Sequence, residues 1–516
     1  MRVERTKNAS RNIVWGIIEK IASLLLPFIT RTVMIKALGA EYLGLSSLFT
    51  SILSVLSISE LGFGTAIVFS MYKPIAEDDN KTLCALLNVY KKIYHLIGTV
   101  ILVGGIAVSP FLNYLIKGTH PSDINIYILY FIYLGNTVIS YFLFAYKAAL
   151  FSAHQRNDLT SKRVTIISLI SNVLKIAVLL TLHNYYAYVI IIPLATILTN
   201  LANAFLANKM FPDIKCIGTI SDEMKSALKK RIVGLISFKI YNVVFASVDT
   251  IVISSFLGLT PLAIYNNYYY IQTSIVGFLT ILTTSITAGV GNKMVTNTRE
   301  ENYKDFKNFT FANGWLCSWC AVCLFCLYQD FMRLWVGEKL LMPMETMALM
   351  VLYFLLPRIT TMTYTYREAA GLWWEDRFRP LVATAVNLLT NLILVKFIGM
   401  NGVIISTLIC TILINVPWGS YILFKNYFKS KPYEYWLQLL FYLIITVIAG
   451  IITIFICNFV SADSWLGLII KALICALIPN VVFWICYHKM SEYKYTKQLA
   501  FRMVGSLKTK ILKKRG

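Results

Sequence analysis

Nine charged side chains lie inside apolar segments long enough to cross a membrane. One of them, Lys471 in the last span, is interpreted as reaching the membrane interface or packing locally. The types of the other eight suit an anionic ligand better than a catalytic reaction. The cations are Lys20, Arg31, Lys175, Lys239 and Arg358. The acids are Glu19, Glu60 and Asp249. Because a charge near the bilayer centre costs roughly 2.5–3.5 kcal/mol on insertion scales, each implies a partner or a ligand. The surplus of cations favours a cavity for phosphate or pyrophosphate, with Arg as a bidentate fork and Lys as a point charge.

Ion pairing between helices is the simpler interpretation of the same charges. Pairing would join Lys239 to Asp249, or Lys20 to Glu60. For any single residue both interpretations stay open. For the whole set pairing is the weaker one, because a buried cation without an anion is costly unless it faces water or an anionic ligand.

A group of cysteines has the spacing of iron–sulfur ligands. The residues are Cys317, Cys320, Cys323 and Cys326. In a helix, each three-residue step turns about 60° backwards, so the four thiols spread over half the circumference. They cannot converge on one cluster, and we interpret them as packing residues. We expect no metal site, no cofactor and no catalytic residues.

The segments that carry these charges are predicted membrane helices. The chain has 516 residues, of which 57% are hydrophobic and only 14% charged, whereas a soluble domain has about a quarter charged residues. Its apolar blocks approach the roughly 20 residues that span a ~30 Å hydrocarbon core. The sequence predicts an all-α integral membrane protein with about fourteen transmembrane helices. They are expected at 13–36, 43–70, 94–116, 124–150, 164–182, 187–207, 232–257, 262–290, 309–331, 346–366, 381–398, 402–424, 436–459 and 465–487.

The formal net charge of +23 reflects membrane orientation and does not point to nucleic acid. With a cytoplasmic N-terminus, most of the 48 Lys and Arg residues fall in cytoplasmic loops and termini, as the positive-inside rule requires. The basic tail would lie against anionic lipid headgroups. We therefore expect both termini to be cytoplasmic and no nucleic-acid partner.

The chain contains an internal duplication. A shift of about 219 positions places Lys20 over Lys239, Gly39 over Gly258 and Asn172 over Asn391. Each repeat holds an even number of spans, so the repeats are parallel and related by an axis along the membrane normal. Lys20 and Lys239 should then face each other across that axis. The expected domains are a first six-helix repeat at 1–210, a cytoplasmic linker at 211–229, a second six-helix repeat at 230–430, two extra transmembrane helices at 431–488 and a basic cytoplasmic tail at 489–516.

Four segments near the N-terminus carry a family resemblance. They are Arg11-Asn12, Pro27 to Arg31, Gly39-Ala40-Glu41-Tyr42-Leu43-Gly44 and Ser59-Glu60-Leu61-Gly62-Phe63-Gly64-Thr65-Ala66. In these segments the chain resembles the polysaccharide flippases of the multidrug/oligosaccharidyl-lipid/polysaccharide (MOP) exporter superfamily. The resemblance implies a V-shaped bundle of two six-helix halves around a positively charged cavity, and a transporter in place of an enzyme.

The resemblance also implies a substrate. Family members turn undecaprenyl-diphosphate-linked oligosaccharide from the cytoplasmic to the outer leaflet of the bacterial inner membrane, for O-antigen and similar surface polysaccharides. In relatives that flip the peptidoglycan precursor, first-helix arginines in the cavity are functional, and the last two helices form a groove for the lipid tail. Arg31 is the closest position here, and Lys20 is the other first-helix cation. The repeat mate of Arg31 is Thr250, so the cavity charge is not symmetric.

The leading hypothesis places the diphosphate on Arg31, Lys20 and Lys239, with Lys175 or Arg358 as further candidates. The acids Glu60, Asp249 and Glu19 would couple transport to H⁺ or Na⁺ or would pair with the cations. The partners implied are the lipid-linked glycan, membrane lipid and the polysaccharide polymerase machinery.

Three alternatives are considered. A cation-coupled multidrug exporter of the same superfamily predicts an acid-rich cavity, which the surplus of cations argues against. A peptidoglycan-precursor lipid flippase is a second alternative. A polysaccharide polymerase or ligase usually needs a large outer loop, and the longest outer stretch here, about Asp330 to Glu345, is short.

Overall fold

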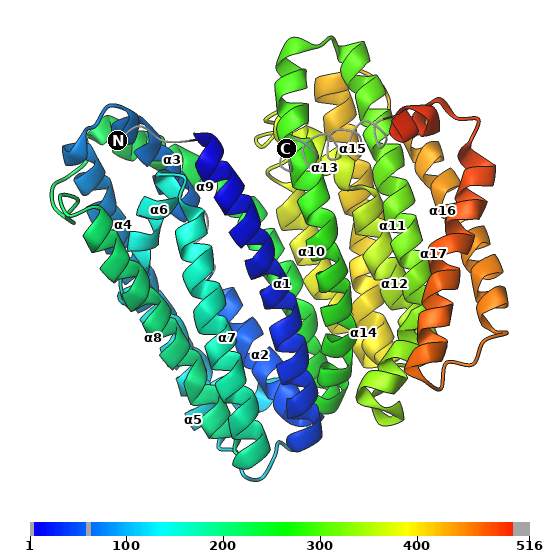
Figure 1. Cartoon of the computed structure of the whole chain (residues 1–516), viewed down its shortest axis with the longest axis horizontal. Helices are drawn as coiled ribbons and strands as arrows, with labels where there is room; N and C mark the ends of the chain where they lie inside the picture. Colours follow the sequence, from blue (N-terminus) through cyan, green and yellow to red (C-terminus); the bar gives the residue numbers. More distant parts are fainter. Residues whose placement is uncertain (1–4, 58–62, 499–516) are drawn as a thin grey trace, which may run out of the picture. The chain divides into compact units, whose positions relative to one another are not determined.

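The computed structural model describes residues 5–57 and 63–498, and every regular element in these ranges is a helix (Figure 1). Within them, 10 helices are long and apolar enough to cross a membrane, and the bent pair Ile126–Phe142 and Ala145–Ala153 makes 11 if it forms one span. The prediction of an all-helical, multi-pass membrane protein is confirmed. The side chains of some helical residues, those of 233–239 among them, lie outside the description.

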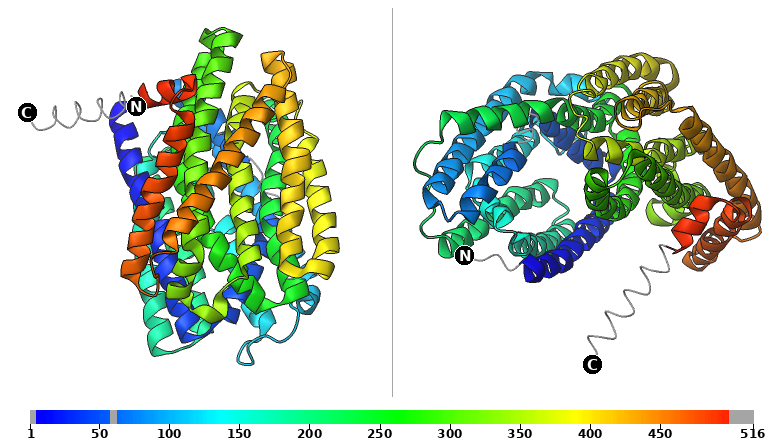
Figure 2. Two further views of the ribbon diagram at one scale, coloured as in Figure 1. Left: turned by 90° about the vertical axis from the view of Figure 1, so that its right-hand side faces the viewer. Right: turned by 90° about the horizontal axis from the view of Figure 1, so that it is seen from above.

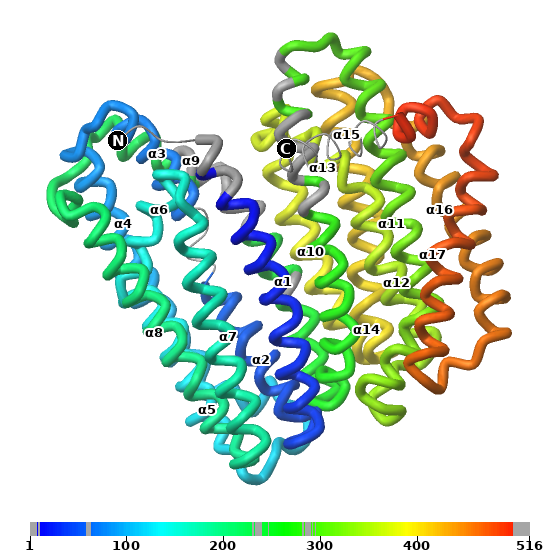
Figure 3. The backbone as a smooth tube through the Cα atoms, in the orientation of Figure 1, coloured from blue at the N-terminus to red at the C-terminus, as the bar shows by residue number. Residues whose placement is uncertain are grey.

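Contacts divide the chain into two compact units, Met1–Asn266 and Asn267–Gly516. The helices of the first unit are α1 (Arg5–Ala37), α2 (Ala40–Leu56), α3 (Phe63–Ala76), α4 (Asn80–Val108), α5 (Ile126–Phe142), α6 (Ala148–Ala153), α7 (Asn157–Thr181), α8 (Tyr185–Met210) and α9 (Asp222–Leu257). Helix α1 packs along α7, α7 against α8, and α8 against α5, while α2 packs against α9 (Figure 3). The first helix is therefore held along its length by a helix more than 120 residues later in the chain.

Local sequence signals explain where helices of this unit begin and bend. The carboxylate of Asp79 accepts a hydrogen bond of 3.0 Å from the amide of Thr82 and caps α4. The side chain of Asn184 accepts from the amide of Ala187 at 3.0 Å and caps α8. Such caps satisfy backbone donors that have no partner inside the helix. Pro27 lies inside α1, about one turn before Arg31.

Two glycines that the duplication aligns adopt nearly the same backbone conformation. Gly39, between α1 and α2, has φ 116° and ψ 170°. Gly258, between α9 and α10, has φ 100° and ψ −176°. This region is open essentially to glycine alone. The link between α1 and α2 and the link between α9 and α10 thus share one backbone conformation, while the duplication itself stays a prediction.

The second unit is built around the long helix α11 (Arg299–Val336). Helix α10 (Leu259–Thr296) begins in the first unit and continues into the second. The elements that follow are α11 (Arg299–Val336), α12 (Met344–Ile359), α13 (Thr361–Ala369), α14 (Arg379–Cys410), the π-helix η5 (Thr411–Asn415), α15 (Val416–Leu423), the π-helix η6 (Phe424–Phe428), α16 (Tyr433–Cys457) and α17 (Trp465–Tyr487). Helix α11 packs against α12, α16 and α17, and the last two helices lie side by side (Figure 2).

Helix α14 is interrupted near its middle. Ile398 (φ −129°, ψ 18°) and Gly399 (φ 57°, ψ −133°) are not helical. A Cβ atom on Gly402 would lie 2.4 Å from the carbonyl oxygen of Leu394, so the chain turns tightly at this point. The interruption falls where the hydropathy pattern separates the predicted spans 381–398 and 402–424.

Gly44 allows α2 to approach the start of α10 closely, and a larger residue should destabilise the first unit. A Cβ atom at Gly44 would lie 2.5 Å from the carbonyl oxygen of Leu259. Gly44→Ala is expected to lower stability by about 1–3 kcal/mol, because two backbones must move apart. The measurement is the thermal unfolding midpoint of the detergent-purified protein. Gly16→Ala in α1 is the control, because its new methyl group would meet no atom within 4 Å. Equal midpoints for the two variants would contradict the tight contact.

Candidate functional site

Arg31 and Asp249 both contact the start of α10. The Nη1 of Arg31 donates a hydrogen bond of 3.2 Å to the backbone oxygen of Asn266. The hydroxyl of Tyr265, the preceding residue, donates to Oδ2 of Asp249 at 3.3 Å. Asp249 is 1% exposed and Arg31 is half-buried. A cation and an acid that the sequence assigned to different roles are therefore linked through consecutive residues of one helix.

Lys175 is held against an aromatic ring. Its Nζ lies 5.6 Å from the ring centroid of Tyr188 on α8, a cation–π contact. The lysine is half-buried in α7, while Tyr188 is buried. The contact described for this cation is with a ring and not with a carboxylate. A half-buried ammonium group of this kind can still accept an anionic partner.

A hydrogen bond between α1 and α7 positions the two cations. The hydroxyl of Thr30 donates to Oδ1 of Asn172 at 2.8 Å, and both side chains are buried. Thr30 precedes Arg31, and Asn172 lies three residues before Lys175. Since α1 and α7 pack along each other, this buried contact sets the register between Arg31 and Lys175.

Buried tyrosines continue from Lys175 into the unit. Tyr188 stacks on Tyr185, with ring centroids 5.6 Å apart and an interplanar angle of 12°. The hydroxyls of Tyr185 and Tyr133 lie 3.3 Å apart, and Tyr133 donates to Oγ of Ser46 at 3.0 Å. We call Tyr133, Tyr185 and Tyr188 the tyrosine cluster. The sequence did not identify it as part of the site.

The remaining candidates of the first unit are not brought to this place by any described contact. Glu19 and Lys20 are partly exposed on α1, and Lys20 lies eleven residues before Arg31, or about 16 Å along a helix. No ion pair within the described part of the chain includes Glu19 or Lys20. The side chain of Lys239 and the whole of Glu60 lie outside the described residues. The two ion pairs suggested by the sequence therefore stay predictions.

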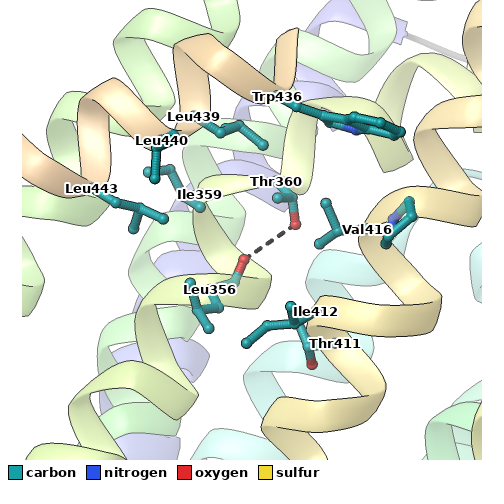
Figure 4. A pocket seen from close by; sticks show the side chains of 11 residues that line it. Leu356, Ile359, Thr360, Thr411, Ile412, Val416, Trp436, Leu439, Leu440 and Leu443 are labelled. Atoms are coloured by element: carbon teal, nitrogen blue, oxygen red, sulfur yellow. Dashed lines mark hydrogen bonds between the residues drawn. The ribbon is translucent and has the colours of Figure 1, made fainter. Parts of the chain in front are cut away.

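Arg358 belongs to the second unit, in the last turn of α12. Its backbone oxygen accepts a hydrogen bond of 2.8 Å from Nδ2 of Asn313 on α11. An apolar pocket of about 340 Å³ begins at this last turn of α12 and lies between α12, the η5–α15 segment and α16 (Figure 4). The pocket is lined by Leu356, Ile359, Thr360, Thr411, Ile412, Val416, Pro417, Trp436, Leu439, Leu440 and Leu443. The hydroxyl of Thr360 donates a hydrogen bond of 3.2 Å to the backbone oxygen of Leu356 (Figure 4). Because this hydroxyl is already bonded, the pocket wall stays apolar.

The chain is similar in fold to solved structures of membrane transporters. Lipid II flippase MurJ, in an inward closed conformation, aligns with a TM-score of 0.61 and 17% identity, covering 93% of this chain and 99% of that chain. A multidrug resistance MATE family transporter of the MOP superfamily, in its inward-facing conformation, aligns with a TM-score of 0.60 and 13% identity over 78% of this chain and 93% of that chain. A Vibrio cholerae MATE transporter aligns with a TM-score of 0.56 and 12% identity over 82% and 99%. At these identities the likeness shows the fold alone.

The sequence comparisons identify the family. No curated protein matches the sequence. The family described as polysaccharide biosynthesis protein matches residues 9–291, which is more than half of the chain. This range includes Arg31, Lys175 and Asp249. The chain is therefore a multi-pass membrane protein of the polysaccharide biosynthesis protein family, with a fold like that of the solved MurJ and MATE transporters.

Proposed function

We propose that the protein is a flippase that moves undecaprenyl-diphosphate-linked oligosaccharide from the cytoplasmic to the outer leaflet by alternating access. The observation that carries the proposal is the pair of half-buried cations in the first unit, Arg31 and Lys175, which a buried contact between α1 and α7 positions. Lys175 faces a ring in place of a carboxylate. A diphosphate would supply an anion for Lys175, and Arg31 offers it a bidentate fork. Lys20, Lys239 and Arg358 are the further cations assigned to the diphosphate.

The proposal includes fourteen spans in two parallel six-helix repeats, 1–210 and 230–430, followed by two extra helices at 431–488. The helical stretch Arg379–Phe428 has 50 residues, about 75 Å at 1.5 Å per residue, which exceeds twice a ~30 Å hydrocarbon core. Its interruption at Gly399 supports two spans in this stretch. The shared conformation of Gly39 and Gly258 supports the duplication.

The apolar pocket of the second unit would hold part of the polyprenyl tail. Its wall includes Ile412 and Leu440, which are 51% and 54% exposed, so the pocket opens on the surface of the unit. An isoprenoid chain gains from contact with such apolar walls. Because Trp436, Leu439, Leu440 and Leu443 come from α16, the pocket gives the first of the two extra helices a role in lipid binding.

Asp249 is the proposed coupling acid, with Glu60 and Glu19 as weaker candidates. It is buried and contacts Tyr265, and a buried carboxylate can change its charge by binding H⁺ or Na⁺. One charge that crosses 100 mV contributes about 2.3 kcal/mol. The distribution of Lys and Arg supports a bacterial inner-membrane location with both termini cytoplasmic.

Depletion of the protein tests the function directly. We expect one undecaprenyl-diphosphate-linked oligosaccharide to accumulate on the cytoplasmic side while surface polysaccharide falls. Mass spectrometry of the lipid-linked glycans, with staining of the surface polymer, measures both. The accumulating species also identifies the substrate, and re-expression of the protein should reverse both changes.

Two other outcomes would replace the proposal. Accumulation of the peptidoglycan precursor would favour the second candidate, a peptidoglycan-precursor flippase, for which the specific observation is the alignment over 99% of lipid II flippase MurJ. Unchanged lipid-linked glycans with reduced dye or drug efflux would favour a cation-coupled multidrug exporter.

A further inference from the structure

Three thiols from three different helices meet inside the second unit. Cys326 comes from α11, Cys457 from the end of α16 and Cys475 from α17, and all three are buried. Their Sγ atoms all lie within 4.8 Å of one another, and those of Cys457 and Cys475 are 3.8 Å apart. We call these residues the thiol triad. Of the four cysteines on α11, only Cys326 belongs to a potential metal-binding group in the described part of the chain.

The size of the triad matches a metal site with three sulfur ligands. A metal–thiolate bond of about 2.3 Å places three sulfurs around one ion about 4.0 Å from each other. The separation of 3.8 Å between two of the thiols is already close to this value. The upper limit of 4.8 Å means that only a small closing movement is needed for the third. A site of this kind requires no rearrangement of the helices.

Contacts around the triad hold α17 in register against α11. Nε1 of Trp319 donates to the backbone oxygen of Cys475 at 2.9 Å, and the thiol of Cys323 lies 3.5 Å from the same oxygen. On the other side, Nζ of Lys471 donates to Oδ2 of Asp330 at 2.7 Å. The sequence did not identify this partner for Lys471. Surrounding contacts of this kind orient ligands before a metal binds.

The type and number of ligands at the triad favour a soft ion that accepts three sulfur ligands. Each thiol that binds a metal loses its proton, so the site becomes negative in a low-dielectric environment. The ammonium group of Lys471, one helical turn before Cys475 on α17, is already paired with Asp330. The walls supply sulfur and apolar groups, and thiolates select soft ions such as Cu(I). Zn(II) in protein sites takes four ligands in almost every structural case, and the triad provides three.

We propose that Cys326, Cys457 and Cys475 form a three-coordinate Cu(I) site that joins the two C-terminal helices to α11. Binding forms three Cu–S bonds and releases up to three thiol protons to solvent, with no change of oxidation state. The site is independent of the proposed glycan substrate. Metal binding would hold α16 and α17 against α11 and so stabilise the second unit.

Titration of the purified, full-length protein tests the site. The reduced protein in detergent, kept without oxygen, is titrated with Cu(I) buffered by bicinchoninate. We expect one Cu(I) bound per chain, with sulfur-to-copper charge-transfer absorption in the ultraviolet. Cys475→Ser should weaken Cu(I) binding by roughly 100-fold or more, beyond the range for loss of an outer-sphere contact. Cys317→Ser is the matched control, because this residue is also buried on α11 but lies outside the triad, and it should bind like the wild type.

A second measurement uses only the wild-type chain, in case a variant fails to fold. Bound Cu(I) should protect Cys326, Cys457 and Cys475 from alkylation by maleimide, as counted by mass spectrometry of peptides, and should leave Cys317 unaffected. Absence of one-to-one Cu(I) uptake by the folded wild type would overturn the proposal. So would recovery of a Cys457–Cys475 disulfide from freshly isolated protein, or tighter binding of Zn(II) than of Cu(I).

Discussion

Replacing Arg31 by Gln is expected to reduce surface polysaccharide export at least tenfold while the protein stays in the membrane at its normal amount. A hydrogen bond to a charged group contributes about 1.5–3 kcal/mol, and every 1.4 kcal/mol is about a factor of ten in binding. Arg31→Lys should restore part of the activity, because it keeps the charge but loses the bidentate fork. Export is measured by surface-polymer staining, and the block by the accumulated lipid-linked oligosaccharide.

The control for Arg31 must remove a positive charge from the same unit without touching the site. Lys81 lies exposed in the first turn of α4, and Lys81→Gln should leave export unchanged. Arg31 also contacts the backbone of Asn266, so the thermal midpoint of each variant must be compared with that of the wild type. Normal export by a folded Arg31→Gln protein would remove Arg31 from the proposed site.

Hydropathy predicted the class of the fold because membrane helices are selected for their apolar content along the whole length. The same pattern placed a boundary near Gly399, where the backbone leaves the helical conformation. The shift of about 219 positions aligns Gly39 with Gly258, and both adopt the positive φ that favours glycine, although the duplication stays a prediction. Features that depend on local composition or on backbone conformation could thus be read from one sequence.

The partners of buried side chains could not be predicted in the same way. The sequence did not identify the hydrogen bond between Tyr265 and Asp249, and the pairing of Asp249 with Lys239 stays a prediction. One residue turns a helix by about 100°, so an error of a single position changes which neighbour a side chain meets. The tyrosine cluster was missed for a different reason, the position of its residues in the predicted span. Tyrosines at the start of a span, such as Tyr185 and Tyr188, resemble the aromatic belt at a membrane interface.

The prediction for the cysteines considered only the helix that carries four of them. Helical geometry predicted that the four cysteines of α11 would not converge with one another, and it treated them as packing residues. It could not include Cys457 and Cys475, which approach Cys326 from helices more than 130 residues later in the chain. The helix-internal argument was sound, but whether other helices supply further thiols depends on tertiary contacts that no spacing reveals.

Asp376→Asn is expected to destabilise the second unit by about 3–5 kcal/mol, the usual cost of breaking a buried ion pair. Oδ1 of Asp376 accepts from Nε of Arg379 at 2.7 Å, and Oδ2 accepts from Nη2 of the same residue at 2.8 Å. Oδ2 also lies 3.2 Å from Nη2 of Arg367. All three side chains are less than 10% exposed. The neutral amide would leave two buried guanidinium groups without the carboxylate that now lies between them.

The expected result is a lower thermal unfolding midpoint of the purified protein and less protein in the membrane. Glu375→Gln is the matched control, since it removes the same charge from the neighbouring, exposed position and should change stability by no more than about 0.5 kcal/mol. Arg367 also passes close to Gly419, where a Cβ atom would lie 2.7 Å from its Nη1, so the guanidinium has little room to find water. If Asp376→Asn and Glu375→Gln unfold at the same temperature, the buried carboxylate does not hold α13 to the start of α14.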